Sequence, residues 1–186
     1  MPCLVLAQGA PTPPTALAQY PAPSGFVNDF AGILDNEIEN GIEAKIAMFT
    51  AQYGGEIAVL TMPTLNEMPI EEFSAVVFKK WGIGKELKDN GVLVVVALKE
   101  RTGRIEIGYG YESILNDAKA GEIIRGQMIP NFKNGDYNKG VEAAVDKIME
   151  VLIAGTPATD SLGQSPEENP IGRFMALTQF IFGFIF

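Results

Sequence analysis

Two loops rich in glycine and in short oxygen-bearing side chains lie on either side of a run of valines and leucines. The first loop, residues 82–91, contains Asp89 and Asn90, and the second, residues 108–117, ends in Asp117. Glycine allows backbone angles that other residues avoid, and carboxylate and amide oxygens are ligands of hard cations. The two loops therefore predict a surface site for a cation or a phosphorylated ligand. Two ordinary turns are the alternative, because Asp-Asn-Gly is also a common turn sequence.

The composition removes several classes of chemistry. The chain has no histidine, which excludes Ser-His-Asp and Cys-His catalysis and nearly all zinc and iron sites. Its single cysteine, Cys3, can form neither a disulfide within the chain nor a thiolate metal cluster. The 14 Lys and Arg against 23 Asp and Glu give a formal charge of −9, which repels the phosphate backbone of nucleic acids. We therefore expect no nucleic-acid partner, and any catalysis must use carboxylates, hydroxyls, Lys, Arg or a hard cation.

Alternating helix and strand patterns surround the two loops. Apolar residues at three- and four-residue steps predict amphipathic helices over residues 38–53, 70–81 and 137–152. Apolar runs predict two parallel strands, residues 56–62 and 91–98, and residues 104–110 should complete a hairpin with the second. Asn116 or Asp117 begins a further helix that Pro130 breaks. Together these elements predict an α/β fold, a mixed sheet with helices on both faces.

The N-terminal residues differ in composition from the middle of the chain. Residues 3–8 form a short apolar run like the end of a secretory signal peptide, and a proline-rich segment follows. We therefore interpret residues 1–25 as a signal-peptide remnant and a linker, and expect the domain that follows, residues 26–153, to be exported. A disordered leader is the alternative.

The C-terminal residues also suggest a membrane-tethered protein. Residues 154–172 are rich in Pro, Ser, Thr, Gly and acids, which is typical of a flexible linker. Residues 173–186 are apolar from Phe174 onward, apart from Thr178 and Gln179, and rich in phenylalanine, but shorter than the roughly 20 residues that span a bilayer. We expect the start of a transmembrane helix here, because an exposed apolar tail would promote aggregation. An interfacial anchor and a helix packed on the domain are the alternatives.

Seven short motifs begin at Phe26, Glu56, Trp81, Asp89, Arg104, Asn116 and Gly135. In this order and with these gaps, they closely resemble the TPM domain family. The family includes a thylakoid-lumen acid phosphatase, photosystem II repair proteins and exported bacterial proteins with a C-terminal membrane helix. The resemblance implies an α/β/α sandwich on the periplasmic side of the membrane, anchored by its C-terminal segment.

The resemblance also implies an acidic surface site, calcium-binding in some members, and assigns it to Asp29, Asp89, Asn90 and Asp117. A Ca²⁺ ion takes about 6 to 8 oxygens, so these side chains with carbonyls and water would complete a site for Ca²⁺, Mg²⁺ or another hard divalent cation. Each residue has an ordinary alternative: Asp29 and Asp117 as helix caps, Asp89 and Asn90 as turn residues. Residues 85–88, Lys-Glu-Leu-Lys, depart from the family pattern, which leaves the shape of their loop open.

Two functions agree with this interpretation. The first is a binding module for membrane protein complexes, in which the cation stiffens the loops that contact the partner. The alternative is a metal-assisted acid phosphatase in which Asp29, Asp89 and Asp117 hold the cation that polarises a phosphomonoester. We assign no catalytic residue, because the sequence contains no recognisable phosphoryl acceptor. Both functions require the acidic side chains to lie together in one oxygen-rich site at one edge of the sheet.

Overall fold

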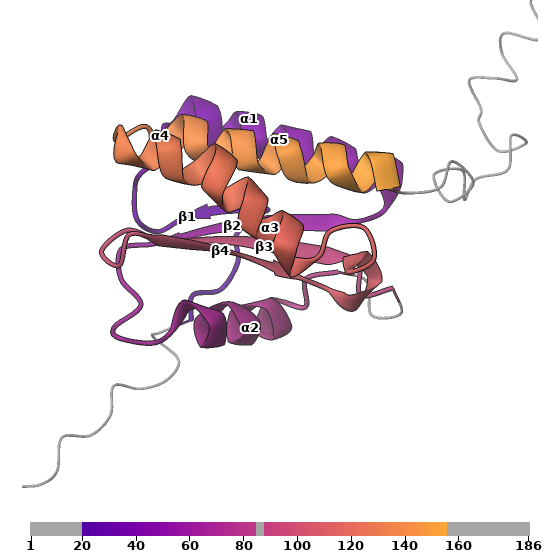
Figure 1. The fold of residues 1–186 in the computed structure, drawn as a ribbon, viewed down its shortest axis with the longest axis horizontal. Coiled ribbons are helices and arrows are strands. Elements are labelled where there is room, and N and C mark those ends of the chain that lie inside the picture. Colours follow the sequence, from indigo (N-terminus) through magenta and orange to yellow (C-terminus); the bar gives the residue numbers. More distant parts are fainter. Residues whose placement is uncertain (1–19, 85–87, 156–186) are drawn as a thin grey trace, which may run out of the picture.

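A four-stranded sheet lies between two helical layers in the computed structural model, which describes residues 20–84 and 88–155 (Figure 1). The strands, in their spatial order, are β1 (Val27–Asp29), β2 (Glu56–Met62), β3 (Gly91–Ala97) and β4 (Thr102–Ile107). The first three strands are parallel, and β4 pairs antiparallel with β3 as a hairpin. The predicted α/β fold with a mixed sheet is confirmed.

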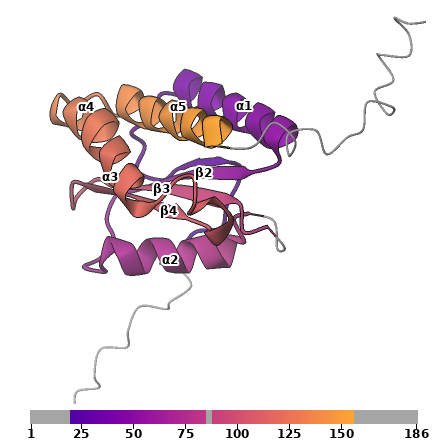
Figure 2. The ribbon, with the colours of Figure 1, turned by 45° about the vertical axis from the view of Figure 1, so that its right-hand side comes forward.

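Helices cover both faces of this sheet. On one face lie α1 (Asn36–Tyr53) and α5 (Tyr137–Gly155), and on the other lies α2 (Ile70–Trp81) (Figure 2). The chain from β4 to α5 passes through four short helical segments: η1 (Tyr109–Tyr111), α3 (Asp117–Ile123), η2 (Ile124–Met128) and α4 (Ile129–Lys133). Of these, α3 and α4 extend the layer of α1 and α5 (Figure 2).

Strand β3 is the centre of the hydrophobic core. All of its residues are buried, and successive side chains point to opposite faces of the sheet. Val94 packs with the layer of α1 and α5, whereas Val95 packs with the layer of α2. Fully burying a valine stabilises the fold by about 1.5 to 3 kcal/mol, so this strand joins two apolar cores into one domain.

The turn from β1 to α1 differs from the sequence prediction. A helix cap was the ordinary alternative for Asp29, but this residue ends a strand of 3 residues that was not predicted, and α1 begins at Asn36. Strand β1 is an edge strand too short for an alternating pattern to be recognised. Its position is fixed by a carboxylate of α1, because Glu43 accepts hydrogen bonds from the main-chain N–H groups of Phe26 (3.0 Å) and Val27 (2.7 Å).

Pro130 does not end the helical path as the sequence indicated. The chain widens into the π-helical segment η2, and Pro130 then occupies the first turn of α4. In the first turn of a helix the missing N–H of proline removes no internal hydrogen bond. The interruption is therefore absorbed by the wide turn that precedes the proline.

No helix within residues 20–84 and 88–155 is long and apolar enough to cross a membrane. The predicted membrane segment, residues 173–186, and residues 1–19 of the predicted leader lie outside the described residues.

Candidate functional site

Asp89 and Asn90 lie where the parallel strands begin. We call this end of the sheet the amino edge and define it as residues 54–56, 88–91 and 107–111. Asp89 is exposed, whereas Asn90 is 9% exposed and leads directly into β3. The loops that the sequence singled out on either side of β3 thus meet at one edge.

Hydrogen bonds hold the loops of the amino edge together. Two join main-chain groups and one uses the Asn90 side chain: Gly108 N to Gly91 O (2.8 Å), Gly110 N to Asp89 O (3.1 Å) and Asn90 Nδ2 to Gly54 O (3.0 Å). Because these bonds connect three separate segments, the edge is a pre-formed surface.

The glycines of the second loop permit this close approach. A Cβ atom on Gly108 would lie 2.1 Å from the main-chain oxygen of Asp89, and one on Gly110 would lie 2.0 Å from that of Lys88. Asp89 itself has a φ of 45°, in the left-handed region that aspartate tolerates better than most residues. The glycine pattern therefore serves the packing of one loop on the other.

Asp29 lies at the opposite end of the sheet. We call this end the carboxyl edge and define it as residues 29–34, 61–65 and 97–103. Asp29 pairs with Thr61 on β2, whereas Gly91, the neighbour of Asn90, pairs with Glu56 at the start of that strand. Five residue steps of about 3.3 Å separate the two positions, or roughly 16 Å. A Ca²⁺ ion binds oxygens at about 2.3 to 2.6 Å, so Asp29 cannot share a cation with Asp89 and Asn90.

The Asp29 carboxylate instead organises the turn into α1. Oδ1 accepts from the N–H of Ile33 (3.2 Å) and Oδ2 from that of Leu34 (2.8 Å). The hydroxyl of Thr61 donates a further short hydrogen bond to Oδ1. Asp29 thus has a structural role that accounts for both of its oxygens.

Asp117 is the exposed first residue of α3. The cap of this helix is the preceding residue, because Asn116 Oδ1 accepts from the N–H of Lys119 at 3.1 Å. A carboxylate in the first turn interacts favourably with the helix dipole. Of the two residues that the sequence offered as caps, Asn116 takes that role.

The predicted metal residues therefore do not form one cluster. In the part of the chain that the structure describes, no group of three or more Asp, Glu, His or Cys side chains is placed to hold a metal ion. Asp89 and Asn90 remain adjacent at the amino edge, where a cation would also need main-chain carbonyls and water to reach six ligands. Calcium binding at that edge stays a prediction.

The second loop places its two tyrosines very differently. Tyr109 is 80% exposed, whereas Tyr111 is only 6% exposed, and burial raises the pKa of its hydroxyl. Neither tyrosine is among the residues that the sequence analysis assigned to the site. The Gly-Tyr-Gly sequence was the available signal, because glycines that pack inward leave the aromatic residue between them on the surface.

The TPM domain model matches residues 27–151 of the chain. A similar solved structure is the N-terminal domain of a protein from P. gingivalis, determined by NMR. It is 35% identical, covers 69% of this chain and 82% of that chain, and superposes with a TM-score of 0.66.

Two further NMR structures are similar to this chain. The BA42 protein of the psychrophilic bacterium Bizionia argentinensis is 25% identical, with a TM-score of 0.57 over 72% of this chain and 91% of that chain. The N-terminal domain of the cg2496 protein of Corynebacterium glutamicum is 15% identical, with a TM-score of 0.56 over 80% of this chain and 89% of that chain, and supports the fold alone. We found no significant match among curated proteins.

Proposed function

Because the chain belongs to the TPM domain family, we propose that it is an extracytoplasmic binding module whose amino edge contacts a membrane protein complex. The observation that carries this proposal is the hydrogen-bonded amino edge, which presents the exposed Tyr109 beside the carboxylate-bearing loop of Asp89.

A pre-formed edge favours binding for a physical reason. Loops that are already fixed lose little conformational entropy when a partner docks. Tyrosine is enriched among the residues that contribute most to protein interfaces, and within the described residues Tyr109 makes no ring contact. The exposed carboxylate of Glu112 lies three residues after Tyr109 in the chain, and that of Asp89 belongs to the neighbouring loop. A partner with a basic surface would therefore be complementary to this edge.

A divalent cation, Ca²⁺ in the first instance, would act at this edge as a stiffening element. Asp89 and Asn90 supply adjacent oxygen-bearing side chains, and main-chain carbonyls and water would complete the ligands. The rest of the proposal depends on composition alone. Residues 1–25 support export, and residues 173–186 support a C-terminal membrane anchor.

A metal-assisted phosphatase is less well supported by the geometry. That activity was expected to use one cation held by Asp29, Asp89 and Asp117, and the strand register separates Asp29 from the Asp89 loop by five residue steps of β2. The hydrogen bonds to Asp29 also give it a role in the β1–α1 turn. The binding module needs no such convergence.

Site-directed photo-cross-linking in membranes tests the proposed contact. A photoreactive residue at position 109 of the full chain should give a discrete cross-linked product with a membrane protein. Position 48 is the matched control, because Met48 is 71% exposed on α1 and is not one of the residues of the amino edge. The same products from positions 109 and 48 would contradict a contact surface at the amino edge.

Two assays on the full chain separate binding from catalysis. Ca²⁺ should raise the melting temperature of the wild type and of Asp29→Asn, but not of Asp89→Ala, because only Asp89 lies at the proposed cation site. Hydrolysis of para-nitrophenyl phosphate should stay at background at acid and neutral pH. If the wild type hydrolyses this substrate and Asp89→Ala does not, the protein is an enzyme and the binding-module proposal is contradicted.

A further inference from the structure

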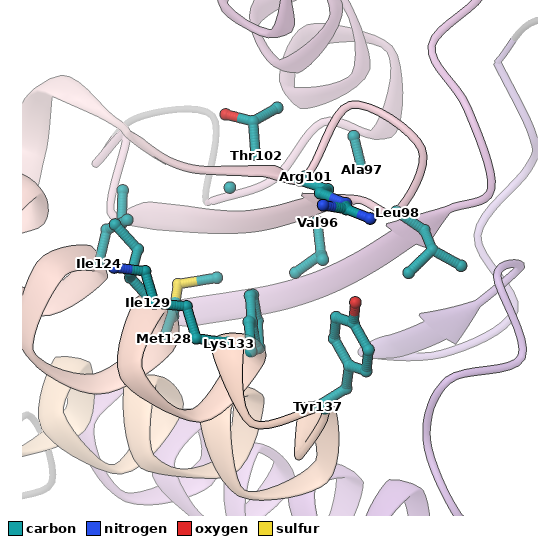
Figure 3. A pocket seen from close by; sticks show the side chains of 13 residues that line it. Val96, Ala97, Leu98, Arg101, Thr102, Ile124, Met128, Ile129, Lys133 and Tyr137 are labelled. Carbon is teal, nitrogen blue, oxygen red and sulfur yellow. The ribbon is translucent and has the colours of Figure 1, made fainter.

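A cavity of about 620 Å³ opens at the carboxyl edge, between the β3–β4 hairpin and the helical path from η2 to α5 (Figure 3). Its volume lies within the roughly 300 to 1,000 Å³ of small-molecule sites. Its position also suits a ligand, because open α/β sheets bind ligands beyond the carboxyl ends of their parallel strands. It lies at the opposite end of the sheet from Asp89 and Asn90, so it is separate from the proposed contact surface.

The walls of the cavity are largely aliphatic. Val96 and Met128 are each 1% exposed and form its buried part, whereas Ile129 is 39% exposed. Figure 3 shows Val96 and Leu98 on the sheet side, and Met128 and Ile129 on the helical side. Met128 belongs to the π-helical segment η2, and such wide turns are frequent at functional sites. This lining fits an apolar chain.

Two basic side chains also line the cavity, together with Thr102, Phe132 and Tyr137. Arg101 comes from the β3–β4 turn, where its φ is 52°, and Lys133 comes from the end of α4. Neither forms an ion pair with another described residue, although the chain carries a formal charge of −9. The nearby carboxylate of Asp136 accepts from the N–H of Lys139 at 3.0 Å, as a cap of α5. The free charges of the lining are therefore positive.

We propose that this cavity binds a medium-chain fatty acid. The alkyl chain would lie between Val96 and Met128, and the carboxylate would accept hydrogen bonds from Arg101 and Lys133. The volume, the aliphatic lining and the two unpaired cations carry this proposal together. A neutral lipid would leave the cations without a partner, and a small anion would leave the aliphatic surface in water.

Methyl NMR of the full chain, with decanoate below its micelle concentration as the probe, tests this proposal. Decanoate should shift the methyl signals of Ile124, Met128 and Ile129. Replacing both cations, as R101Q/K133Q, should weaken binding by roughly tenfold or more, since it removes two charge-assisted hydrogen bonds. The matched control is K99Q/K139Q, which removes the same charge from exposed lysines outside the cavity lining and should leave the affinity within about twofold.

A second variant fills the cavity and leaves the cations in place. Ile129→Trp changes a partly exposed lining residue, so the fold should persist, and decanoate binding should weaken. Decanol and acetate are the ligand controls and should bind more weakly than decanoate. The proposal is overturned if decanol binds as tightly as decanoate, or if the methyl signals of the cavity do not move. It is also overturned if R101Q/K133Q and K99Q/K139Q lose equal affinity for decanoate, or if Ile129→Trp keeps the wild-type affinity.

Discussion

Asp29 shows that a carboxylate in a family motif can serve the fold. Three donors converge on it, the N–H groups of Ile33 and Leu34 and the hydroxyl of Thr61. We expect Asp29→Ala to lower the free energy of unfolding by about 2 to 3 kcal/mol, because partly buried donors lose their acceptor. Urea denaturation measures this, and Asp117→Ala, at an exposed position, should cost no more than about 1 kcal/mol. Equal losses in the two variants would contradict the structural role of Asp29.

The burial of Tyr111 predicts how the stability of the domain changes at alkaline pH. Burial raises the pKa of its hydroxyl above the ordinary value of 10.0, so the folded state disfavours the phenolate. The unfolded chain releases this proton at a lower pH than the folded domain, and stability should therefore fall as the pH rises above about 10. In Tyr111→Phe this part of the alkaline loss should disappear from melting curves recorded between neutral pH and pH 11.

The exposed neighbour Tyr109 provides the control for that experiment. Tyr109→Phe changes the same side-chain type in the same loop, and the pH dependence of melting should match that of the wild type. An identical alkaline loss in wild type and Tyr111→Phe would show that the burial of Tyr111 does not influence the stability.

The loop position of Asp89 and Asn90 could be predicted from the sequence, but the position of Asp29 could not. Asp89 and Asn90 were expected in a loop before a buried strand, and they lie there. Asp29 was assigned to the same site, and its true position depends on the register of β1 against β2. That register is set by tertiary contacts such as the one from Glu43, which leave no local pattern in the sequence.

Among the elements, β1 is held to α1 by the side chain of Glu43. Its first N–H groups would be unpaired at the sheet edge without the carboxylate of Glu43. Removing the acceptor in Glu43→Ala should lower the free energy of unfolding by about 2 kcal/mol and speed amide exchange at Val27. Hydrogen exchange followed by NMR measures this residue by residue. Glu37→Ala, an exposed position on the same helix, should leave the exchange of Val27 unchanged. Protection of Val27 that persists in Glu43→Ala would refute this account.

Elements with strong periodicity were predicted closely, and polar contacts between elements were not. The strand over residues 56–62 has the predicted bounds, because an uninterrupted apolar run leaves few alternatives. Arg104 and Glu106 alternate with isoleucines, a pattern typical of a solvated strand face, yet they lie partly buried beneath α2. There Arg104 Nε contacts Glu106 Oε2 at 2.8 Å, and Ser74 Oγ lies 3.1 Å from each of these two atoms. Only the packing of α2 reveals this group.

At the scale of the whole molecule, one sheet separates two apolar cores and carries the two proposed binding sites at its opposite ends. The core on the α2 side also includes the first described residue, Tyr20, whose ring stacks on Phe73 at 5.5 Å. The neighbouring carbonyl of Pro21 accepts from Trp81 Nε1 at 2.9 Å, so this N-terminal segment fastens α2. The amino edge and the carboxyl-edge cavity therefore lie on a scaffold whose layers are joined through β3.

Because β3 joins the α2 layer to the layer of α1 and α5, we expect the two layers to unfold together. Trp81 is the only tryptophan, so its fluorescence reports the α2 layer, whereas far-UV circular dichroism is dominated by the longer helices α1 and α5. Phe73 is fully buried in the α2 core, and Phe73→Leu should cost about 1 to 3 kcal/mol. Because β3 contributes side chains to both cores, the urea transitions seen by the two probes should coincide in the wild type and shift equally in the variant. The exposed change Met48→Leu should shift neither. A fluorescence transition that precedes the circular dichroism transition in Phe73→Leu would mean that α2 detaches alone, and the sheet would then support two separate units.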